Sequence, residues 1–369
     1  MKKRTLIVLI LILKVAVSIA QENYIDKFEG LQNKKVIAVG ESAHGVKEFA
    51  EWNINLFKEL VRNGVAQTFM LENDFSNTKQ LNRYISESTY SSVLDSLMNE
   101  NLNNIWQTKK MKEFLEWAKD YNAGKEENEK IKLIGFDSQK GNYAIKEILK
   151  FIDSNYPEFR NELSGKGLEL LSQIKHNKNY NIKKLSKDEQ QLMKSTLDNL
   201  NVLFTHKIDA NESIQIDVLA LNHAWEYENA NPLNFTVIRD RNMATLFKEA
   251  TKNETKPVFM WAHNGHINKS NTSFYKPIGF HLFKEYGTEY LAIGLDFKEI
   301  KDSKNNVAIK DSNWLANKIE FDNNDIQIIK TKGIGTYVIR EASFSLQKKM
   351  KLKNDNEFDY IVYFRELKK

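Results

Sequence analysis

The sequence predicts an α/β fold in which helices flank a mostly parallel central sheet. Five short apolar runs, each bounded by charged or turn-forming residues, have the pattern of buried strands. An amphipathic stretch separates the first two runs, and this order of strand, helix and strand is typical of a βαβ unit. The interval 138–250 has helical patterns but no comparable apolar run. We therefore expect a helical insertion, or cap, between the third and fourth core strands.

The elements follow one another in a regular order along the chain. Apolar residues recur at helical spacing from Val46 to Val61, and Gly64 is suited to end that helix. Helical patterns also precede the third and fifth runs, at 108–124 and 279–287. The segments GTYVIRE and FDYIVYFRE near the C-terminus are candidates for additional edge strands. The five predicted core strands are KKVIAVGE (34–41), AQTFMLEN (66–73), KIKLIGFD (130–137), KPVFMWAHN (256–264) and EYLAIGLDF (289–297).

The predicted insertion divides one domain rather than joining two. Residues 21–137 and 251–369 are expected to form the two parts of a single α/β core, with 138–250 as the excursion between them. No Ser/Gly-rich linker separates the insertion from the core.

Residues 1–20 have the layout of a secretory signal peptide, with a basic start, an apolar run and a small-residue ending. A retained anchor is the alternative. The run from Leu6 to Leu13 is shorter than the ~20 apolar residues that a bilayer span needs, and Lys14 follows it. We expect cleavage after Ala20, a periplasmic or secreted protein, and no membrane span in the mature chain.

Charge and cysteine content exclude several classes of function. Removal of the four basic residues in the predicted signal peptide lowers the formal net charge from +5 to +1. This change removes the main argument for a nucleic-acid partner, so none is expected. The chain has no cysteine, which excludes disulfides, zinc-thiolate sites and a cysteine nucleophile.

Polar residues stand at the ends of all five predicted strands. In an open parallel sheet, ligands bind beyond the carboxyl ends of the strands. Such residues also cap helices or bond turn amides, but their recurrence on strands distant in sequence favours one shared site. In chain order they are Glu41 with His44, Glu72, Asp137, His263 with Asn264 and His266, and Asp296.

Some of these residues also have a simpler structural explanation. Ser42 is suited to cap the following helix, and Asp137 to hold the turn before Gln139. His266 is a candidate to bond a loop carbonyl, which would leave His263 alone facing the pocket.

The remaining histidines are expected to have no role in the site. His176 and His206 are predicted surface residues of the insertion, and His223 with Glu226 a surface pair on one helix face.

Histidines and carboxylates without a serine or cysteine nucleophile suggest water as the attacking group. A histidine beside a carboxylate is a good base near neutral pH, because the carboxylate raises its basicity and selects its tautomer. Helix amides or an imidazolium are candidates to stabilise an oxyanion. The sequence has no G-x-S-x-G elbow, no P-loop and no G-x-G-x-x-G motif.

Five motifs, in order over residues 30–300, resemble those of the erythromycin esterase family. They are GESAHGVKEF (40–49), FMLENDFS, GFDSQ, RDRNMATLF (239–247) and WAHNGHINK (261–269). The resemblance implies an α/β core with a helical cap and metal-independent ester hydrolysis, without a cofactor. A small-molecule ester or lactone is the expected substrate, with macrolide antibiotics, and hence antibiotic resistance, among the candidates.

The resemblance also assigns roles to individual residues. It implies that His44 is the base that activates water, with Glu41 and His263 needed beside it and Glu72 lining the same site. The residues expected to bind substrate are His266, Arg239, Asp137 and Asn264.

One departure from the family pattern and two other functions remain open. Some members have an arginine nine residues after the loop histidine, where this chain has Asn53; Arg239 or Arg241 is the candidate replacement. A metal-dependent hydrolase would use His44, Glu72, His263 and His266 as ligands, which suit zinc, manganese or iron. A non-enzymatic iron- or haem-binding envelope protein is the third hypothesis, because a more distant relative of the fold binds haem iron.

Overall fold

A computed structural model describes residues 24–90, 92–175, 181–270, 276–301, 308–321, 325–341, 348–353 and 356–368. Its centre is a seven-stranded sheet in the order β3-β2-β4-β1-β5-β9-β6. All neighbouring strands are parallel except β6, which runs antiparallel to β9 at one edge. The bounds are β1 Val36–Val39, β2 Thr68–Asp74, β3 Lys132–Asp137, β4 Val258–Trp261, β5 Tyr290–Ile300, β6 Ile326–Lys330 and β9 Tyr360–Leu367. The predicted fold class is confirmed.

The central strands are apolar on both sides because helices cover both faces of the sheet. Along β1, Ile37 and Val39 pack into one core, whereas Val36 and Ala38 pack into the other. This alternation follows from the two-residue period of a strand. The helices of the first face are α2 Lys47–Arg62, α3 Phe75–Ser86, α4 Leu94–Asn101 and α5 Lys109–Asn122.

The opposite face is covered mainly by α10 Phe235–Thr251 and α12 Ile278–Tyr286. Met243 and Phe247 of α10 are fully buried in this core with strand residues such as Met260. The last helix of the expected insertion therefore packs against the sheet itself.

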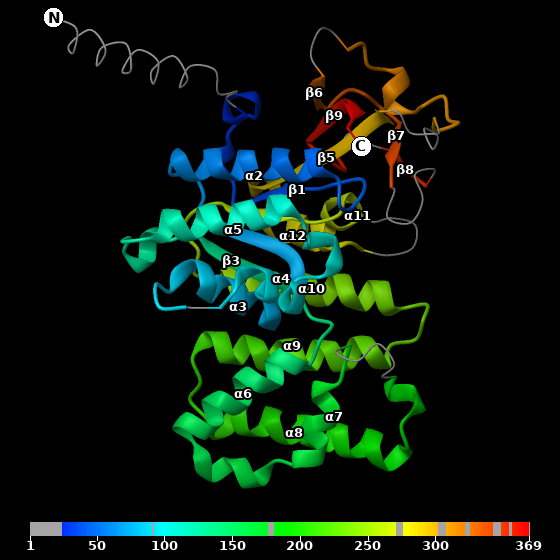
Figure 1. The fold of residues 1–369 in the computed structure, drawn as a ribbon. Coiled ribbons are helices and arrows are strands. Elements are labelled where there is room, and N and C mark those ends of the chain that lie inside the picture. The colour runs from blue at the N-terminus through cyan, green and yellow to red at the C-terminus, as the bar shows by residue number, and fades with distance from the viewer. Residues whose placement is uncertain are drawn as a thin grey trace, which may run out of the picture.

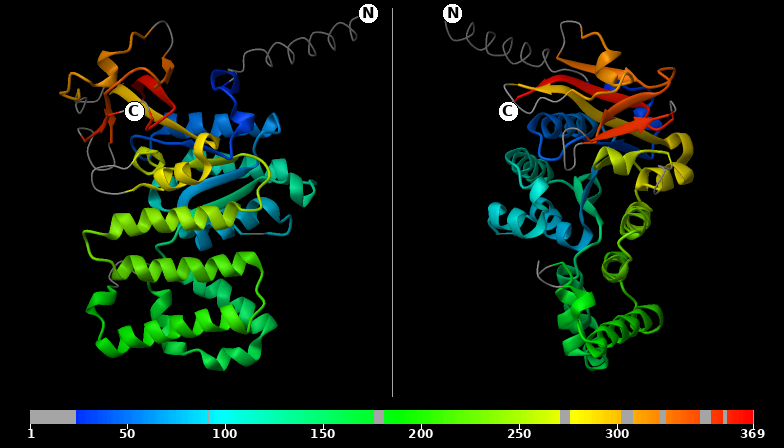
Figure 2. Two further views of the ribbon diagram at one scale, coloured as in Figure 1. Left: turned by 180° about the vertical axis from the view of Figure 1, so that it is seen from behind. Right: turned by 90° about the vertical axis from the view of Figure 1, so that its right-hand side faces the viewer.

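The rest of the insertion forms a helical lobe with its own apolar core. Figures 1 and 2 show this lobe at the end of the molecule opposite strands β6 to β9. Its helices are α6 Asn142–Asn155, α7 Gly165–Ser172, α8 Lys187–His206 and α9 Glu212–Asn229.

The expected surface pair of His223 and Glu226 is a wrong prediction for the histidine. His223 is buried, and its burial lowers its pKa to about 4. Glu226 instead accepts hydrogen bonds from Arg241 and Asn242. His206 is exposed, as expected, whereas His176 and the predicted signal peptide lie outside the described residues.

The C-terminal strands explain a second difference from the sequence prediction. FDYIVYFRE supplies β9, which is an internal strand of the sheet, and GTYVIRE supplies β7 Tyr337–Arg340 of a separate two-stranded sheet with β8 Lys349–Leu352. Because β9 extends its pairing along β5, Asp296 lies within that strand and not at its end. Its buried carboxylate accepts a bond from the Arg340 backbone and also interacts with Ser42, in the loop after β1.

No helix in the described parts of the chain combines the length and apolar character that a membrane span requires.

The close approach of β1 to α11 Asn264–Ile267 generates a prediction at Gly40. A Cβ atom at Gly40 would lie 2.1 Å from Asn264 Oδ1 and 3.0 Å from Asn264 Cα. We expect Gly40→Ala to lower the free energy of unfolding by about 1–3 kcal/mol, because the packed backbone leaves no room for the methyl group. Denaturant unfolding checks this. Gly165→Ala, which meets no atom within 4 Å, is the matched control; equal stability of both variants would contradict the prediction.

Candidate active site

Four neighbouring strands bring the strand-end residues together at one edge of the sheet. In the order β3, β2, β4 and β1, their carboxyl ends supply Asp137, Glu72, His263 and the loop that carries Glu41 and His44. Gly45 turns this loop into α2 with a φ of 73°, a conformation that glycine adopts without strain. The parallel sheet thus converts four distant sequence positions into one cluster.

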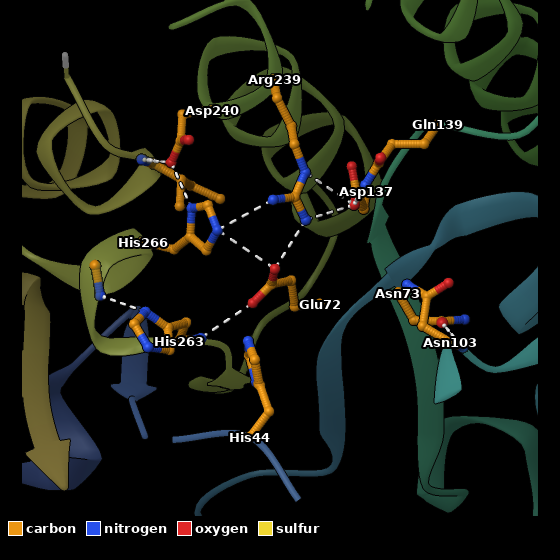
Figure 3. A network of polar contacts seen from close by, with 12 residues as sticks. His44, Glu72, Asn73, Asn103, Asp137, Gln139, Arg239, Asp240, His263 and His266 are labelled. Atoms are coloured by element: carbon orange, nitrogen blue, oxygen red, sulfur yellow. Dashed lines mark hydrogen bonds and ion pairs between the residues drawn. The ribbon is translucent and has the colours of Figure 1, made fainter. Parts of the chain in front are cut away.

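His44 and Glu41 form a hydrogen-bonded pair. The distance from His44 Nδ1 to Glu41 Oε1 is 2.6 Å, and the side chains are 21% and 1% exposed. Trp261 Nε1 donates to the other carboxylate oxygen of Glu41 at 3.3 Å. Burial disfavours the charged imidazole, but the Glu41 carboxylate outweighs this effect and raises the pKa of His44 above its ordinary value of 6.5. Figure 3 shows the His44 ring pointing toward Glu72.

Glu72 lies at the centre of the polar network. Its Oε2 accepts the backbone N–H of His263 at 3.0 Å, and its Oε1 lies 2.8 Å from Arg239 Nη2 and 3.3 Å from His266 Nε2. Burial alone would raise the pKa of this carboxyl. The cationic His266 and Arg239 reverse that effect and hold the pKa of Glu72 well below its ordinary value. Glu72 is therefore an ionised, fully engaged acceptor.

Arg239 of α10 bridges two strand ends. Its Nη2 lies 2.7 Å from Asp137 Oδ2 and 2.8 Å from Glu72 Oε1, and its Nε donates to Asp137 Oδ2 at 3.1 Å (Figure 3). The planar guanidinium presents several donors in fixed directions, which suits this bridging position. Arg239 keeps 20% of its side chain exposed to solvent.

His266 is an imidazolium whose side chain is only 12% exposed. Its Nδ1 lies 2.8 Å from Asp240 Oδ1, and its Nε2 contacts Glu72. Burial opposes the charge, but Asp240 and Glu72 raise the pKa of His266 to about 10. An imidazolium nitrogen is a donor, so the 3.2 Å approach of Arg239 Nη1 to His266 Nε2 brings two cations together. The neighbouring carboxylates compensate for their repulsion.

His263 differs from both neighbouring histidines. Its Nδ1 accepts the Gly265 N–H at 3.2 Å, and its ring also bonds the Ser42 backbone. Burial and the positive charges of His44 and His266 lower its pKa to about 3, so the ring is neutral near pH 7. Its centroid lies 5.1 Å from that of His44. His263 thus packs beside His44 and links the loops after β1 and β4.

Two of the residues expected to bind substrate have different local functions. Asn264 is completely buried and exchanges two hydrogen bonds with the Leu295 backbone, so its side chain is not available to a ligand. Asp137 accepts bonds from Arg239, Ser138 and Gln139, which combines the expected turn role with support of Arg239. Arg239 and His266 remain the partly exposed groups of the expected substrate-binding set.

Sequence reasoning missed two residues that contact the site. Asp240 binds His266 and also accepts the Ile278 N–H at 2.9 Å. The only sequence feature that could have indicated this role is the position of Asp240 next to Arg239 in the RDRNMATLF motif. Trp106 lies edge-on to His44 and donates through Nε1 to the Glu72 backbone carbonyl at 2.8 Å. No strand end or motif marked Trp106.

Asn53 lies on α2 and is fully buried, and neither of its side-chain polar atoms has a hydrogen-bond partner within the described structure. Its side chain is therefore enclosed by protein and not available to a ligand. Arg239, in contrast, pairs with Glu72 and Asp137 at two strand ends.

The ion pairs of Arg239 generate a stability prediction, with Arg241, two residues later on the same helix, as the control position. Arg239→Met would leave Glu72 and Asp137 buried without their shared cation, so we expect a loss of about 3–5 kcal/mol in the free energy of unfolding. Arg241→Met removes a pair that is about half exposed and should cost less than about 1 kcal/mol. Equilibrium denaturation of both variants measures the difference; similar losses would contradict the assigned role of Arg239.

Comparison with known sequences gives one family match and one related protein. The sequence matches the family described as erythromycin esterase over residues 65–316, a range that starts after the Glu41–His44 loop. A Bacillus subtilis (strain 168) protein named "Putative hydrolase YbfO" is 24% identical over 271 residues, which are 67% of this chain and 59% of that protein. The chain thus matches less than two thirds of that relative's length.

Three solved structures share the fold at 17–20% sequence identity. A Bacillus cereus protein superposes with a TM-score of 0.78 over 92% of this chain and 90% of its own. A protein described as a succinoglycan biosynthesis protein gives 0.76 over 94% and 92%. A mutant of the erythromycin esterase EreC in its open conformation gives 0.66 over 91% and 92%. On the strength of the family match, which covers more than half of its length, the chain belongs to the erythromycin esterase family.

Proposed function

We propose that this protein hydrolyses an ester or lactone with water activated by His44. The observation that carries the proposal is the pairing of His44 Nδ1 with Glu41, next to a cluster that contains two cations. The family match supports hydrolysis as the reaction class. A candidate base, His44, and a cationic cluster, Arg239 with His266, therefore both lie at the carboxyl ends of the strands.

His44 is suited to act as the general base. With Nδ1–H donated to Glu41, the neutral tautomer leaves Nε2 unprotonated and able to take a proton from water. No hydrogen-bond partner for Nε2 is found among the described residues. The Glu41 carboxylate stabilises the imidazolium that forms during attack, as does the nearby charge of Glu72.

Arg239 and His266 are suited to stabilise the oxyanion. The water-derived hydroxide bonds to the acyl carbon, and the carbonyl electron pair moves onto its oxygen, which the two cations attract. The acyl–oxygen bond then breaks, and the His44 imidazolium returns its proton to the departing alkoxide. Glu72, Asp137 and Asp240 hold the cations in place.

The substrate is proposed to be a small-molecule ester or lactone, and macrolides are candidates within this class. The predicted signal peptide at residues 1–20 would direct export of the protein, and we expect it in the periplasm or outside the cell.

Replacement of the proposed base gives the first functional test. We expect His44→Ala to lower kcat/KM by about 10²–10⁴-fold, the usual contribution of a general base. A panel of aryl esters and macrolactones provides the assay. His206→Ala, an exposed histidine of α8, is the control and should behave as wild type. A folded His44→Ala variant with full turnover would show that the mechanism is wrong.

The Glu41–His44 pair also predicts the pH dependence. Only neutral His44 can accept a proton, so kcat/KM should rise with pH through an apparent pKa above 6.5. Glu41→Gln removes the carboxylate and leaves the effect of burial, which lowers the His44 pKa; the acid limb should therefore move to lower pH. Glu51→Gln, about half exposed on α2, should leave the profile unchanged. An acid limb that stays in place in Glu41→Gln would contradict the assignment.

A metal-dependent mechanism predicts that a chelator abolishes activity, whereas the proposed mechanism predicts that activity is retained. In the part of the chain that the structure describes, no group of three His, Cys, Asp or Glu side chains is arranged to hold a metal ion. Arg239 contacts both Glu72 and His266, which also contact each other, and a metal ion bound by these two side chains would have to displace Arg239. We expect kcat/KM to survive treatment with a chelator in samples whose metal content is measured. Loss of activity that zinc or manganese restores would favour the metal-dependent mechanism.

A further inference from the structure

A small apolar surface lies at the junction of α9 and α10. Leu233, Phe235 and Val237 are 87%, 45% and 38% exposed. They make up three of the five large apolar side chains that are exposed in the described parts of the molecule. The other two, Val93 and Val202, lie elsewhere, before α4 and on α8. Val237 lies two residues after Phe235 and therefore points to another side of α10. We call Leu233 and Phe235 the junction surface.

The junction surface is continuous with the candidate active site. Phe235 is the first residue of α10, and Arg239 lies four residues later, one turn along the same helix face. The Phe235 ring packs edge-on against Tyr227 of α9, with centroids 6.2 Å apart. Arg239 and Asp137 are among the charges that act on the Tyr227 hydroxyl.

We propose that Leu233 and Phe235, with the Tyr227 ring, bind the apolar part of the substrate, and that preferred substrates carry an aryl or medium-chain alkyl group next to the ester. This inference rests on the proposed function and adds a substrate class to it. The ester carbonyl would lie near Arg239 and His266, with its apolar group directed along the first turn of α10. Burial of that group removes apolar surface of both molecules from water.

The dimensions of the junction surface favour a small molecule over a protein partner. Two exposed apolar side chains are far fewer than the 20–30 residues that each side of a stable protein interface usually supplies. Polar residues surround them: Asn231 and Asn234 are exposed in the same loop. A short apolar surface with one end at a cationic site matches an ester whose polar and apolar ends are close together.

Chain-length dependence tests this inference. Hydrolysis of 4-nitrophenyl acetate and octanoate is compared in wild type and in the double variant Leu233→Ser/Phe235→Ser. We expect the octanoate to acetate ratio of kcat/KM to fall about tenfold in the variant, well below the full effect of burying six methylene groups. Val202→Ser, on α8 and 51% exposed, is the matched control and should leave the ratio unchanged. An unchanged ratio in the double variant would overturn the inference.

A binding experiment separates this inference from the proposed function. Calorimetric titration with non-hydrolysable N-(4-nitrophenyl)octanamide and the corresponding acetamide needs no turnover. Tighter octanamide binding that only the double variant loses supports the junction surface, even if no ester is hydrolysed and the proposed function fails. Ester hydrolysis without this difference keeps the proposed function and overturns the junction surface. A double variant that changes only oligomeric state or binding to phosphatidylcholine vesicles also overturns it.

Discussion

The buried Glu72 carboxylate is the interaction on which the candidate site depends. It connects β2 to the start of α11 through the His263 backbone, to α10 through Arg239, and to His266. An ionised carboxylate in the protein interior is stable only when charges and donors compensate for its lost hydration. Each partner is therefore held at a defined place relative to the strand ends. The helix that carries Arg239 also packs on the sheet, so the fold and the site constrain one another.

The site separates three histidines into three electrostatic environments. His44 is hydrogen-bonded to the Glu41 carboxylate, which raises its pKa. His263 is kept neutral by burial and positive neighbours, and His266 is kept charged by Asp240 and Glu72. Groups whose environments move their pKa values apart can take different parts in acid–base chemistry. In this arrangement the neutral base and the cationic cluster coexist at the same pH, which is what attack by water on an ester carbonyl requires.

Local patterns were sufficient to predict the core strands, the first helix and the helical insertion, because apolar runs and helical periodicity directly reflect burial. The convergence of Glu41, His44, Glu72, Asp137, His263 and His266 also followed, since parallel strands place their carboxyl ends at one edge. Side-chain partners were harder to predict. Asp240, Trp106 and the internal bonds of Asn264 depend on packing between distant elements. Asp296 lies within β5, and not at its end, because β9 prolongs that strand, and His223 is buried because the insertion folds around its own core.

Isotope incorporation in a single turnover is the most direct test of water as the nucleophile. Excess enzyme in ¹⁸O-labelled water converts an ester substrate in a single turnover. The masses of the acid product and of the intact enzyme are then measured by mass spectrometry. Direct attack by His44-activated water predicts one ¹⁸O atom in the first acid released and an enzyme of unchanged mass throughout the turnover. An acylated enzyme, or a first acid product that contains only ¹⁶O from a protein carboxylate, would contradict this account.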